Sequence, residues 1–339
     1  MTDHSDLDSL VTRMKSTTAP IRQTLQSLHQ KYLPLEAGKV ADYIPELASA
    51  DPNAFAIAVA GVDGQIVDAG DAERLFSIQS VSKPFVYGLA LDTHGRDLVL
   101  SKVNVEPSGE AFNSIVLDEA TNRPFNPLVN SGAIATTDLV AGADYTARVK
   151  ALLRLFENYT GRPVFVDNAT FISERTTGHR NRAIAHLMLN FGMIQDRVEE
   201  TLELYFQQCA ILVNCRDLAL MAATLANGGV NPVTGVRAIE AKHVRDLLSL
   251  MFSCGMYDYA GSWGYLVGLP AKSSVSGAIL AVVPGQFGIA VYSPPLDARG
   301  NSVRGIAVCT ELSERFGLHA FDAHLTGPTL ADEFRPARR

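Results

Sequence analysis

The chain has 339 residues, which is long enough to bury one large core or two smaller ones. Hydrophobic residues make up 47% and charged residues 19% of it, which excludes wholesale disorder. The 29 basic and 36 acidic residues give a net charge of -7, so no basic excess offers a footprint for nucleic acid. No run of about 18 apolar residues predicts a membrane-spanning helix. We therefore expect neither nucleic acid nor a membrane as a partner.

The two ends of the chain are expected to lie outside the folded body. Residues 1–25 are polar, without an apolar run of signal-peptide type, and predict an extension. Residues 327–339 predict a flexible tail. The four cysteines lack CxxC spacing and the eight histidines are scattered, so we expect reduced, buried thiols and no metal site. The expected location is the cytoplasm, and residues 26–326 are expected to form a single domain of two lobes.

The first strong strand signal is a hairpin at 54–70, "AFAIAVAGVDGQIVDAG". Two apolar runs flank the dipeptide Asp63-Gly64, which favours a tight turn between antiparallel strands. The hairpin is therefore predicted to open the sheet lobe, to which we assign residues 40–115 and 230–326.

The next stretch, "FSIQSVSKPFVYG", predicts a helix that begins close to Ser80. Pro84 is tolerated only in the first helical turn, and residues three apart share a helix face. The Ser80 hydroxyl and the Lys83 amine can therefore meet. A neutral lysine could take the serine proton, and burial at a helix start would lower the lysine pKa. The free N–H groups of the first turn could help to hold an oxyanion.

The same stretch has an ordinary structural interpretation. Ser-x-x-Lys occurs often by chance as an exposed helix start with a capping serine, so the motif alone does not establish catalysis. Ser77 and Ser82 are rival hydroxyls. Ser82 points elsewhere on the helix, while Ser77 precedes the helix and could cap it.

The middle of the chain is predicted to be mainly helical, and we assign residues 116–229 to a helical lobe. The stretch "NPLVNSGAI" offers Asn130 and Ser131 from a polar turn, which could equally be a helix cap. In "CRDLALMAATLANGG" an apolar stripe at helical spacing ends at Gly228-Gly229, which is typical of a helix terminus.

The C-terminal third carries a second group of strand signals. "KSSVSGAI" leads into three β-rich runs separated by Pro284-Gly285 and by a loop with Pro294, Pro295 and Gly300, which predicts a meander of three strands. Penicillin-binding enzymes carry a Lys-Thr/Ser-Gly triplet on such an edge strand, facing the nucleophile. Here Lys272 is followed by two serines, so Ser274 replaces the glycine of that triplet.

These elements predict an α+β fold. The hairpin and the meander would join into one antiparallel sheet of about five strands, because sequential strands usually neighbour one another. Helices would flank the sheet and build the second lobe, leaving a cleft between the lobes as the natural place for a site.

Together the stretches resemble the serine-dependent glutaminases, amidohydrolases whose core is related to serine β-lactamases. The resemblance covers residues 41–306, nearly the whole folded chain, and its stretches occur in family order. They are "ADYIPELA", "FSIQSVSKPF", "FNPLVNSGAI", "FISERTTGHRN", "LYFQQCA", "AATLANGG", "SCGMYD", "GLPAKSSVSGAI" and "SPPLDARGNSVRGI".

The resemblance implies roles for individual residues. By matching position, Ser80 is the nucleophile and Lys83 its base. The chemistry of Tyr257 adds that it could relay a proton to the leaving ammonia. The implied substrate-binding positions are Tyr43, Gln79, Ser80, Asn130, Glu174, Asn181, Tyr205, Tyr257 and Val275. The backbone N–H groups of Ser80 and Val275 are implied to form the oxyanion hole. No cofactor is implied.

The chemistry of these residues suits glutamine as the substrate. A zwitterion with a side-chain amide needs an anion such as Glu174 for its ammonium and Asn or Tyr donors for its carboxylate. Taken singly, each residue has an ordinary alternative: a solvated carboxylate for Glu174, a turn cap for Asn181 and a core position for Tyr205. The ordered match of all the stretches favours the functional interpretation.

Two positions depart from the family pattern. Ser131 stands where alanine is usual, and His179 stands where an acidic residue is common. We interpret His179 as an ordinary solvated histidine.

The predicted reaction is hydrolysis of L-glutamine to L-glutamate and ammonia. The alternatives are a penicillin-binding or β-lactamase-type acyl-serine enzyme and an inactive glutamine-binding sensor. The resemblance also implies a homodimer or homotetramer.

Overall fold

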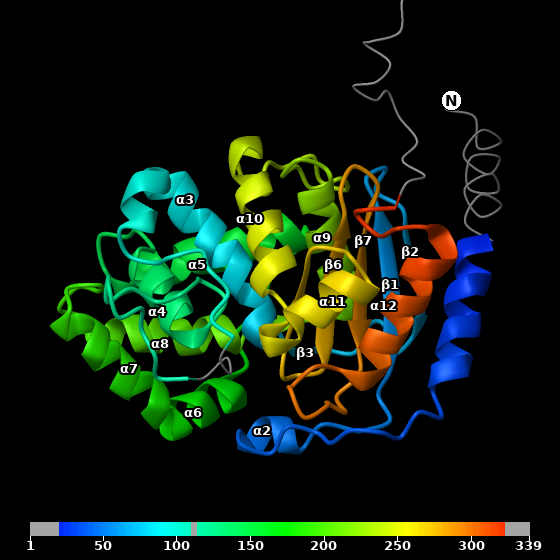
Figure 1. Cartoon of the computed structure of the whole chain (residues 1–339), viewed down its shortest axis with the longest axis horizontal. Coiled ribbons are helices and arrows are strands. Elements are labelled where there is room, and N and C mark those ends of the chain that lie inside the picture. Colours follow the sequence, from blue (N-terminus) through cyan, green and yellow to red (C-terminus); the bar gives the residue numbers. More distant parts are fainter. Residues whose placement is uncertain (1–19, 110–113, 323–339) are drawn as a thin grey trace, which may run out of the picture.

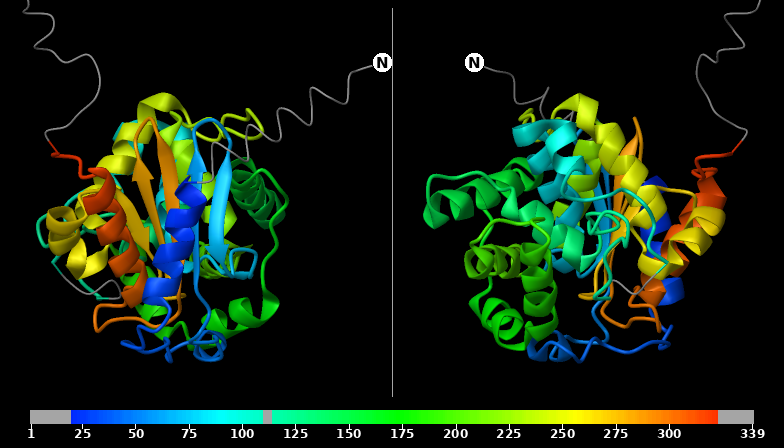
Figure 2. Two further views of the ribbon diagram at one scale, coloured as in Figure 1. Left: turned by 90° about the vertical axis from the view of Figure 1, so that its right-hand side faces the viewer. Right: turned by 60° about the vertical axis from the view of Figure 1, so that its left-hand side comes forward.

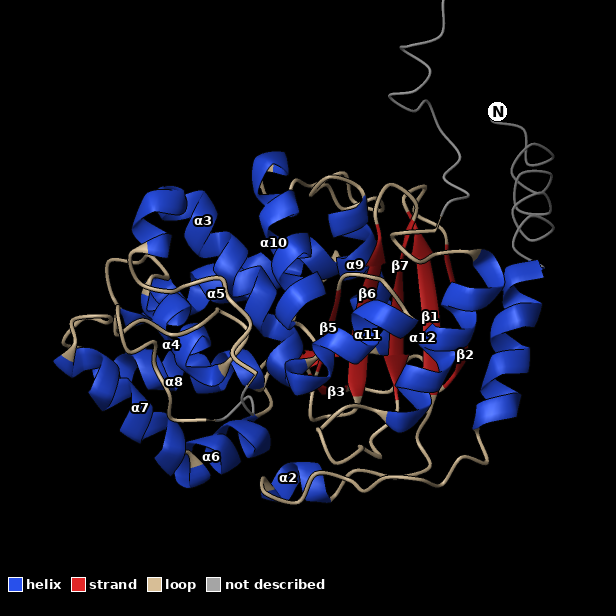
Figure 3. Cartoon of the chain, viewed as in Figure 1, coloured by secondary structure: helices blue, strands red, loops and turns tan. Residues whose placement is uncertain are grey.

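A computed structural model describes residues 20–109 and 114–322, so the predicted tail at 327–339 and residues 1–19 lie outside the described part. The molecule has two halves (Figure 1). Figure 3 shows the large sheet confined to one half, while the other half is built of helices. The predicted α+β architecture is thereby confirmed.

The sheet has five antiparallel strands in the order β2-β1-β7-β6-β5. Its strands are β1 (Ala56–Gly61), β2 (Ile66–Gly70), β5 (Ala271–Ser273), β6 (Ala278–Val283) and β7 (Phe287–Tyr292). The register pairs Ala60 with Ile66 across the predicted hairpin, where Gly64 takes a left-handed φ of 84°. The N-terminal hairpin joins the C-terminal strands through β1 and β7, as predicted. A short pair, β3 (Phe76–Ser77) and β4 (Leu212–Val213), lies beside it.

Both faces of the sheet are buried, which explains why its strands are continuous apolar runs. Along β6, Leu280 packs in one core and Ala281 in another, because successive side chains point to opposite faces. One face packs against α9 (Cys215–Ala226) and the other against α12 (Val303–Phe316) and the helix at 20–32, which lie side by side (Figure 2). Gly288 allows the approach of α9, since a Cβ there would lie 2.4 Å from the Ala219 carbonyl oxygen.

The prediction that the third β-rich run of the meander forms a strand is wrong, because this run forms α12. The fifth strand of the sheet is β5, which carries Lys272. Ser302 caps α12 by accepting a hydrogen bond from the Gly305 N–H. The buried positions of this segment, Gly305, Val308, Cys309 and Leu312, recur at helical and not at strand spacing. The predicted edge-strand position of Lys272 is nevertheless correct, because β5 ends the sheet.

Helices build the other half, whereas α11 (Ala260–Leu266) packs on the sheet face that α12 covers. The remaining helices are α2 (Pro45–Ala48), α3 (Lys83–Leu100), α4 (Asn130–Asp138), α5 (Tyr145–Thr160), α6 (Asn168–Thr177), α7 (His179–Asn190), α8 (Val198–Cys209) and α10 (Ala241–Cys254), with 3-10 turns η1 (Gln79–Ser82) and η2 (Tyr257–Tyr259). Of these, α4, α7 and α8 share a core of their own. The predicted helix at 215–226 is α9, but it packs on the sheet and not in the helical half to which we had assigned it. Its small side chains explain this placement, because they let the sheet approach closely.

The folded body begins earlier than residue 26. Leu25 is fully buried in the helix at 20–32, and Glu311 of α12 accepts hydrogen bonds from Lys31 and Tyr32 of that helix. The described part of the extension predicted at 1–25 is therefore the start of a packed helix. Across the described ranges, no helix is both long and apolar enough to cross a bilayer.

Candidate active site

A cavity of about 370 Å³ contains most of the residues predicted to bind substrate. Residues from α4, α6, α7, α8, η1 and the loop after β5 converge on it, although they are far apart in the sequence. The predicted residues that line it are Tyr43, Gln79, Ser80, Asn130, Glu174, Asn181, Tyr205 and Val275. Tyr257 reaches the same place from η2, as described below.

Ser80 lies in the 3-10 turn η1, directly before α3 begins at Lys83. Pro84 occupies the first turn of α3, as predicted. Gln79 has a φ of 49°, a left-handed conformation that non-glycine residues seldom adopt. Such backbone strain persists only where the surrounding structure enforces it, and it is common at functional sites. Here it turns the chain so that the buried Ser80 faces the cavity.

Lys83 is fully buried behind the cavity. Its Nζ donates to Asn130 Oδ1 at 2.7 Å and to the Leu128 carbonyl oxygen at 3.4 Å. Burial lowers the pKa of Lys83 to about 8, against the opposing influence of Cys209 and Glu174. A substantial fraction of Lys83 is therefore neutral slightly above neutral pH, as a general base requires.

The predicted meeting of the Ser80 hydroxyl and the Lys83 amine is replaced by other partners. Ser80 forms a hydrogen bond with the Tyr257 side chain, and Tyr257 donates to the Ser273 carbonyl oxygen at 3.3 Å. Lys83 instead donates to two carbonyl-type oxygens, which suit its charged form because an ammonium only donates. The charged form cannot accept the serine proton, since it has no lone pair.

Glu174 lies within α6 and is buried, which excludes the solvated alternative. Burial raises its pKa to about 7, while the hydrogen bond with Gln79 and the charge of Lys83 oppose the rise. A buried carboxylate without a tightly paired cation is costly, so a cationic ligand entering the cavity would stabilise its charged form.

Asparagine side chains connect Lys83 to the cavity. Asn130 Nδ2 donates to Asn181 Oδ1 at 3.0 Å while Asn130 Oδ1 accepts from Lys83. Asn130 is the first residue of α4, but its side chain makes these contacts and does not cap the helix. Asn181 lies in the first turn of α7, and Tyr205 of α8 is buried in the cavity wall.

Two backbone N–H groups at the cavity have no acceptor within the described residues. These belong to Ser80, at the start of η1, and to Val275, in the loop that follows β5. Buried N–H groups are almost always paired. Unpaired donors that line the same cavity as a hydroxyl can hold a negatively charged oxygen that develops there.

Some cavity residues were not among the sequence predictions. Ile44, Thr177, Gly178, Arg180 and Cys209 also line it. Each is a close chain neighbour of a predicted residue, and that adjacency was the available signal.

The two positions that depart from the family pattern have different surroundings. His179 is exposed at the start of α7, in agreement with a solvated histidine, and Ser131 is buried in α4. Within the described ranges, no group of three or more potential metal ligands occurs.

An antiparallel sheet beside a Ser-x-x-Lys motif, with the serine in a 3-10 turn and the lysine at the start of the helix that follows, places the chain in the β-lactamase-like class of proteins. A model of the family described as Glutaminase matches residues 38–321. The chain belongs to the glutaminase family.

Individual relatives agree with this assignment. The chain is 61% identical to a Glutaminase of Trichormus variabilis over 90% of this chain and 91% of that protein. The solved structure of a probable glutaminase, ybaS, is 40% identical with a TM-score of 0.86, over 88% of this chain and 97% of that one. Mglu in its glutamate form is 44% identical with a TM-score of 0.87, over 91% of this chain and 71% of that one.

Proposed function

We propose that this enzyme hydrolyses L-glutamine to L-glutamate and ammonia through an ester on Ser80. The carrying observation is the convergence of eight predicted residues from separated segments on one cavity around Ser80. The family assignment and the relatives named Glutaminase support the reaction. The glutamate form recorded for Mglu supports an amino-acid-sized ligand.

The first half of the reaction forms the ester. Neutral Lys83 takes the Ser80 proton as Oγ bonds to the carbonyl carbon of the substrate side chain, and the C=O electron pair moves onto oxygen. The N–H groups of Ser80 and Val275 hold that oxyanion. When the carbonyl re-forms, the C–N bond breaks and the nitrogen takes the proton that Lys83 holds, either directly or relayed through the Tyr257 hydroxyl, so that ammonia leaves and Lys83 is neutral again.

The second half repeats these steps with water. Lys83 takes a proton from the water as its oxygen attacks the glutamyl ester, and collapse of the intermediate returns a proton to Ser80. Glu174 pairs with the substrate ammonium, while Asn130, Asn181, Tyr43 and Tyr205 donate to its polar groups. These roles need no group outside the chain.

Ammonia release from purified protein tests this function. We expect release from L-glutamine to exceed release from L-asparagine by about 100-fold or more, because a side chain one methylene shorter misplaces the reacting carbonyl relative to Ser80. Hydroxylamine should divert part of the product to γ-glutamyl hydroxamate, as an ester intermediate requires. Absence of ammonia from both amides would contradict the proposal.

The shifted pKa values of Glu174 and Lys83 predict how kcat/KM depends on pH. Glu174 must be ionised to pair with the substrate ammonium and has a pKa of about 7, whereas Lys83 must be neutral and has a pKa of about 8. Both requirements are met increasingly as pH rises, so kcat/KM should increase from about pH 6 to about pH 9. Burial raises the pKa of Tyr257 to about 12, so its proton is retained over this range.

The pH profile of kcat/KM is the measurement, and Glu174→Gln is the informative variant. That substitution should remove the lower inflection and raise KM, while the inflection from Lys83 remains. A wild-type profile that is flat or falls over this range would contradict the assignment of both groups.

Two other functions remain distinguishable. A penicillin-recognising enzyme would be labelled covalently at Ser80 by penicillin, and a sensor would bind glutamine without turnover. The Lys272-Ser273-Ser274 triplet on β5 is the feature that favours the former. Against it, Lys272 is fully buried and its amine donates to the Gly255 and Ser273 carbonyl oxygens.

We also propose a cytoplasmic homo-oligomer, a dimer or a tetramer. The four cysteines are free and buried, which is usual for proteins of reducing compartments. Apolar side chains such as Phe165 and Tyr265 are exposed, as at surfaces that associate. Light scattering of the purified protein and fractionation of cells test these two expectations.

A further inference from the structure

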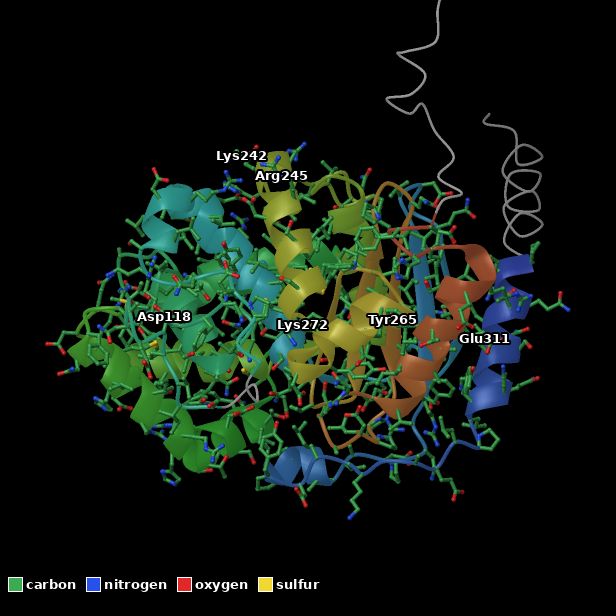
Figure 4. The ribbon with its side chains drawn as sticks, in the orientation of Figure 1. Asp118, Lys242, Arg245, Tyr265, Lys272 and Glu311 are labelled. Atoms are coloured by element: carbon green, nitrogen blue, oxygen red, sulfur yellow. The ribbon has the colours of Figure 1, made fainter. Side chains whose placement is uncertain are left out.

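The feature that the proposed reaction leaves unused is the second buried lysine of the site. Lys272 lies on the edge strand β5, where α10 meets the sheet (Figure 4), and its side chain is fully buried. A buried ammonium is expensive unless its donors are satisfied, and burial together with the nearby charge of Lys83 lowers the pKa of Lys272 well below its usual value.

Two carbonyl oxygens and one aromatic ring contact the Lys272 amine. Nζ donates to the Ser273 carbonyl oxygen at 2.7 Å and to the Gly255 carbonyl oxygen at 2.9 Å. It also lies 4.1 Å from the centre of the Tyr257 ring, within the range of a cation–π contact. The amine therefore meets two carbonyl oxygens and one aromatic face.

These contacts connect β5 to the segment that carries Tyr257. Gly255 packs so closely on the strand that a Cβ there would lie 1.7 Å from the Ala271 carbonyl oxygen, and its own carbonyl accepts the Ser273 N–H at 3.2 Å. Two residues later, Tyr257 has a left-handed φ of 56°. A non-glycine residue holds such a conformation only where neighbouring contacts enforce it.

The Ser273 carbonyl oxygen is a partner shared by both side chains. It accepts from Lys272 Nζ and from the Tyr257 hydroxyl, at 2.7 Å and 3.3 Å, and that hydroxyl is hydrogen-bonded to Ser80. Lys272 thus fixes the ring of Tyr257 on its face and shares the oxygen that orients its hydroxyl. The ring cannot turn away from Ser80 without breaking these contacts.

We infer that Lys272 is a positioning residue for the reaction, which holds the Tyr257 hydroxyl against Ser80 and does not itself touch substrate. This rests on the proposed function. The residue enters the chemistry only through Tyr257, so its removal should slow turnover and leave substrate binding nearly unchanged. It should also have little further effect once the Tyr257 hydroxyl is gone.

A double-mutant cycle with Lys272→Met, Tyr257→Phe and both substitutions tests this inference. We expect Lys272→Met to lower kcat about 30-fold with KM within about threefold of wild type. In the Tyr257→Phe background the same change should lower kcat by less than about threefold, because contacting residues that act as a unit are non-additive. Methionine has a similar length and suits a buried site, so the fold should persist.

Controls separate positioning from stability. Lys272→Gln gives a second variant, and thermal melting monitors the fold of each. Arg304→Met is the matched control: Arg304 is another buried cation that donates to backbone carbonyls, those of Leu33, Leu35 and Pro52, on the other side of the sheet. It should lower the melting temperature with kcat per folded molecule within about twofold of wild type.

Three outcomes overturn the inference. They are a folded Lys272→Met enzyme with kcat within about twofold of wild type, an undiminished loss in the Tyr257→Phe background, and failure of both Lys272 variants to fold. Wild-type ammonia release tests the function itself. Its absence overturns both proposals, whereas an active wild type with an unimpaired Lys272→Met variant overturns only this inference.

Discussion

Ser80→Ala is expected to lower the rate of ammonia release from L-glutamine by about 10⁴-fold or more. The substitution removes the hydroxyl oxygen that forms the glutamyl ester in the proposed reaction, while the cavity and its polar groups stay in place. The residue is nearly buried and the change is small, so the fold should be retained. Steady-state kinetics and glutamate binding by calorimetry measure the two effects separately, and binding should change little.

Ser82→Ala is the matched control for this experiment. Ser82 lies in the same turn and is buried, but its hydroxyl donates to the Gln79 carbonyl oxygen and accepts from Gln208. Its removal should cost about 1–3 kcal/mol of stability, because Gln208 loses a buried acceptor, with little loss of kcat. Equal activity of the Ser80→Ala and wild-type proteins would exclude Ser80 as the nucleophile.

Lys83→Met is expected to lower kcat by about 10³-fold or more, because the serine then has no neighbouring base. Methionine fills a similar volume in the fully buried site, and removing a buried charge often leaves stability unchanged or improved. The residual activity should also lose the inflection that the pKa of about 8 produces in the wild-type profile. Thermal melting and the pH profile of kcat provide the two measurements.

Lys102→Met serves as the control for the loss of a lysine. Lys102 follows the end of α3 and donates to the Gly192 carbonyl oxygen at 2.8 Å, outside the cavity. Its removal should change kcat by less than about twofold. A Lys83→Met enzyme that keeps the wild-type rate and pH profile would require a different base.

Local sequence patterns predicted the elements whose signals are short-range. The Asp63-Gly64 turn, the helix start before Pro84 and the helix ending at Gly228-Gly229 depend on backbone preferences of neighbouring residues. The segment 303–316 shows where such reasoning failed. Its β-branched and apolar residues favour a strand, but the Ser302 cap and packing on the sheet gave a helix, since tertiary burial overrides weak propensity.

For the candidate site, the sequence predicted which residues take part but not which side chains they contact. The Ser80-Lys83 spacing and the ordered family stretches predicted the candidate residues, because residue type and order are properties of the chain. Their partners were not predictable. The Lys83–Asn130 contact, the Ser80–Tyr257 contact and the place of Lys272 under the Tyr257 ring join segments far apart in the sequence.

The sequence by itself determined the family, the nucleophile motif and the two-ended origin of the sheet. Only the tertiary structure decided which proton acceptors are available, because burial sets the pKa of Lys83 and Glu174, and burial is a property of the packed molecule. It likewise placed α9 against the sheet and gave β5 its edge position. Long-range packing selects among arrangements that local patterns permit equally.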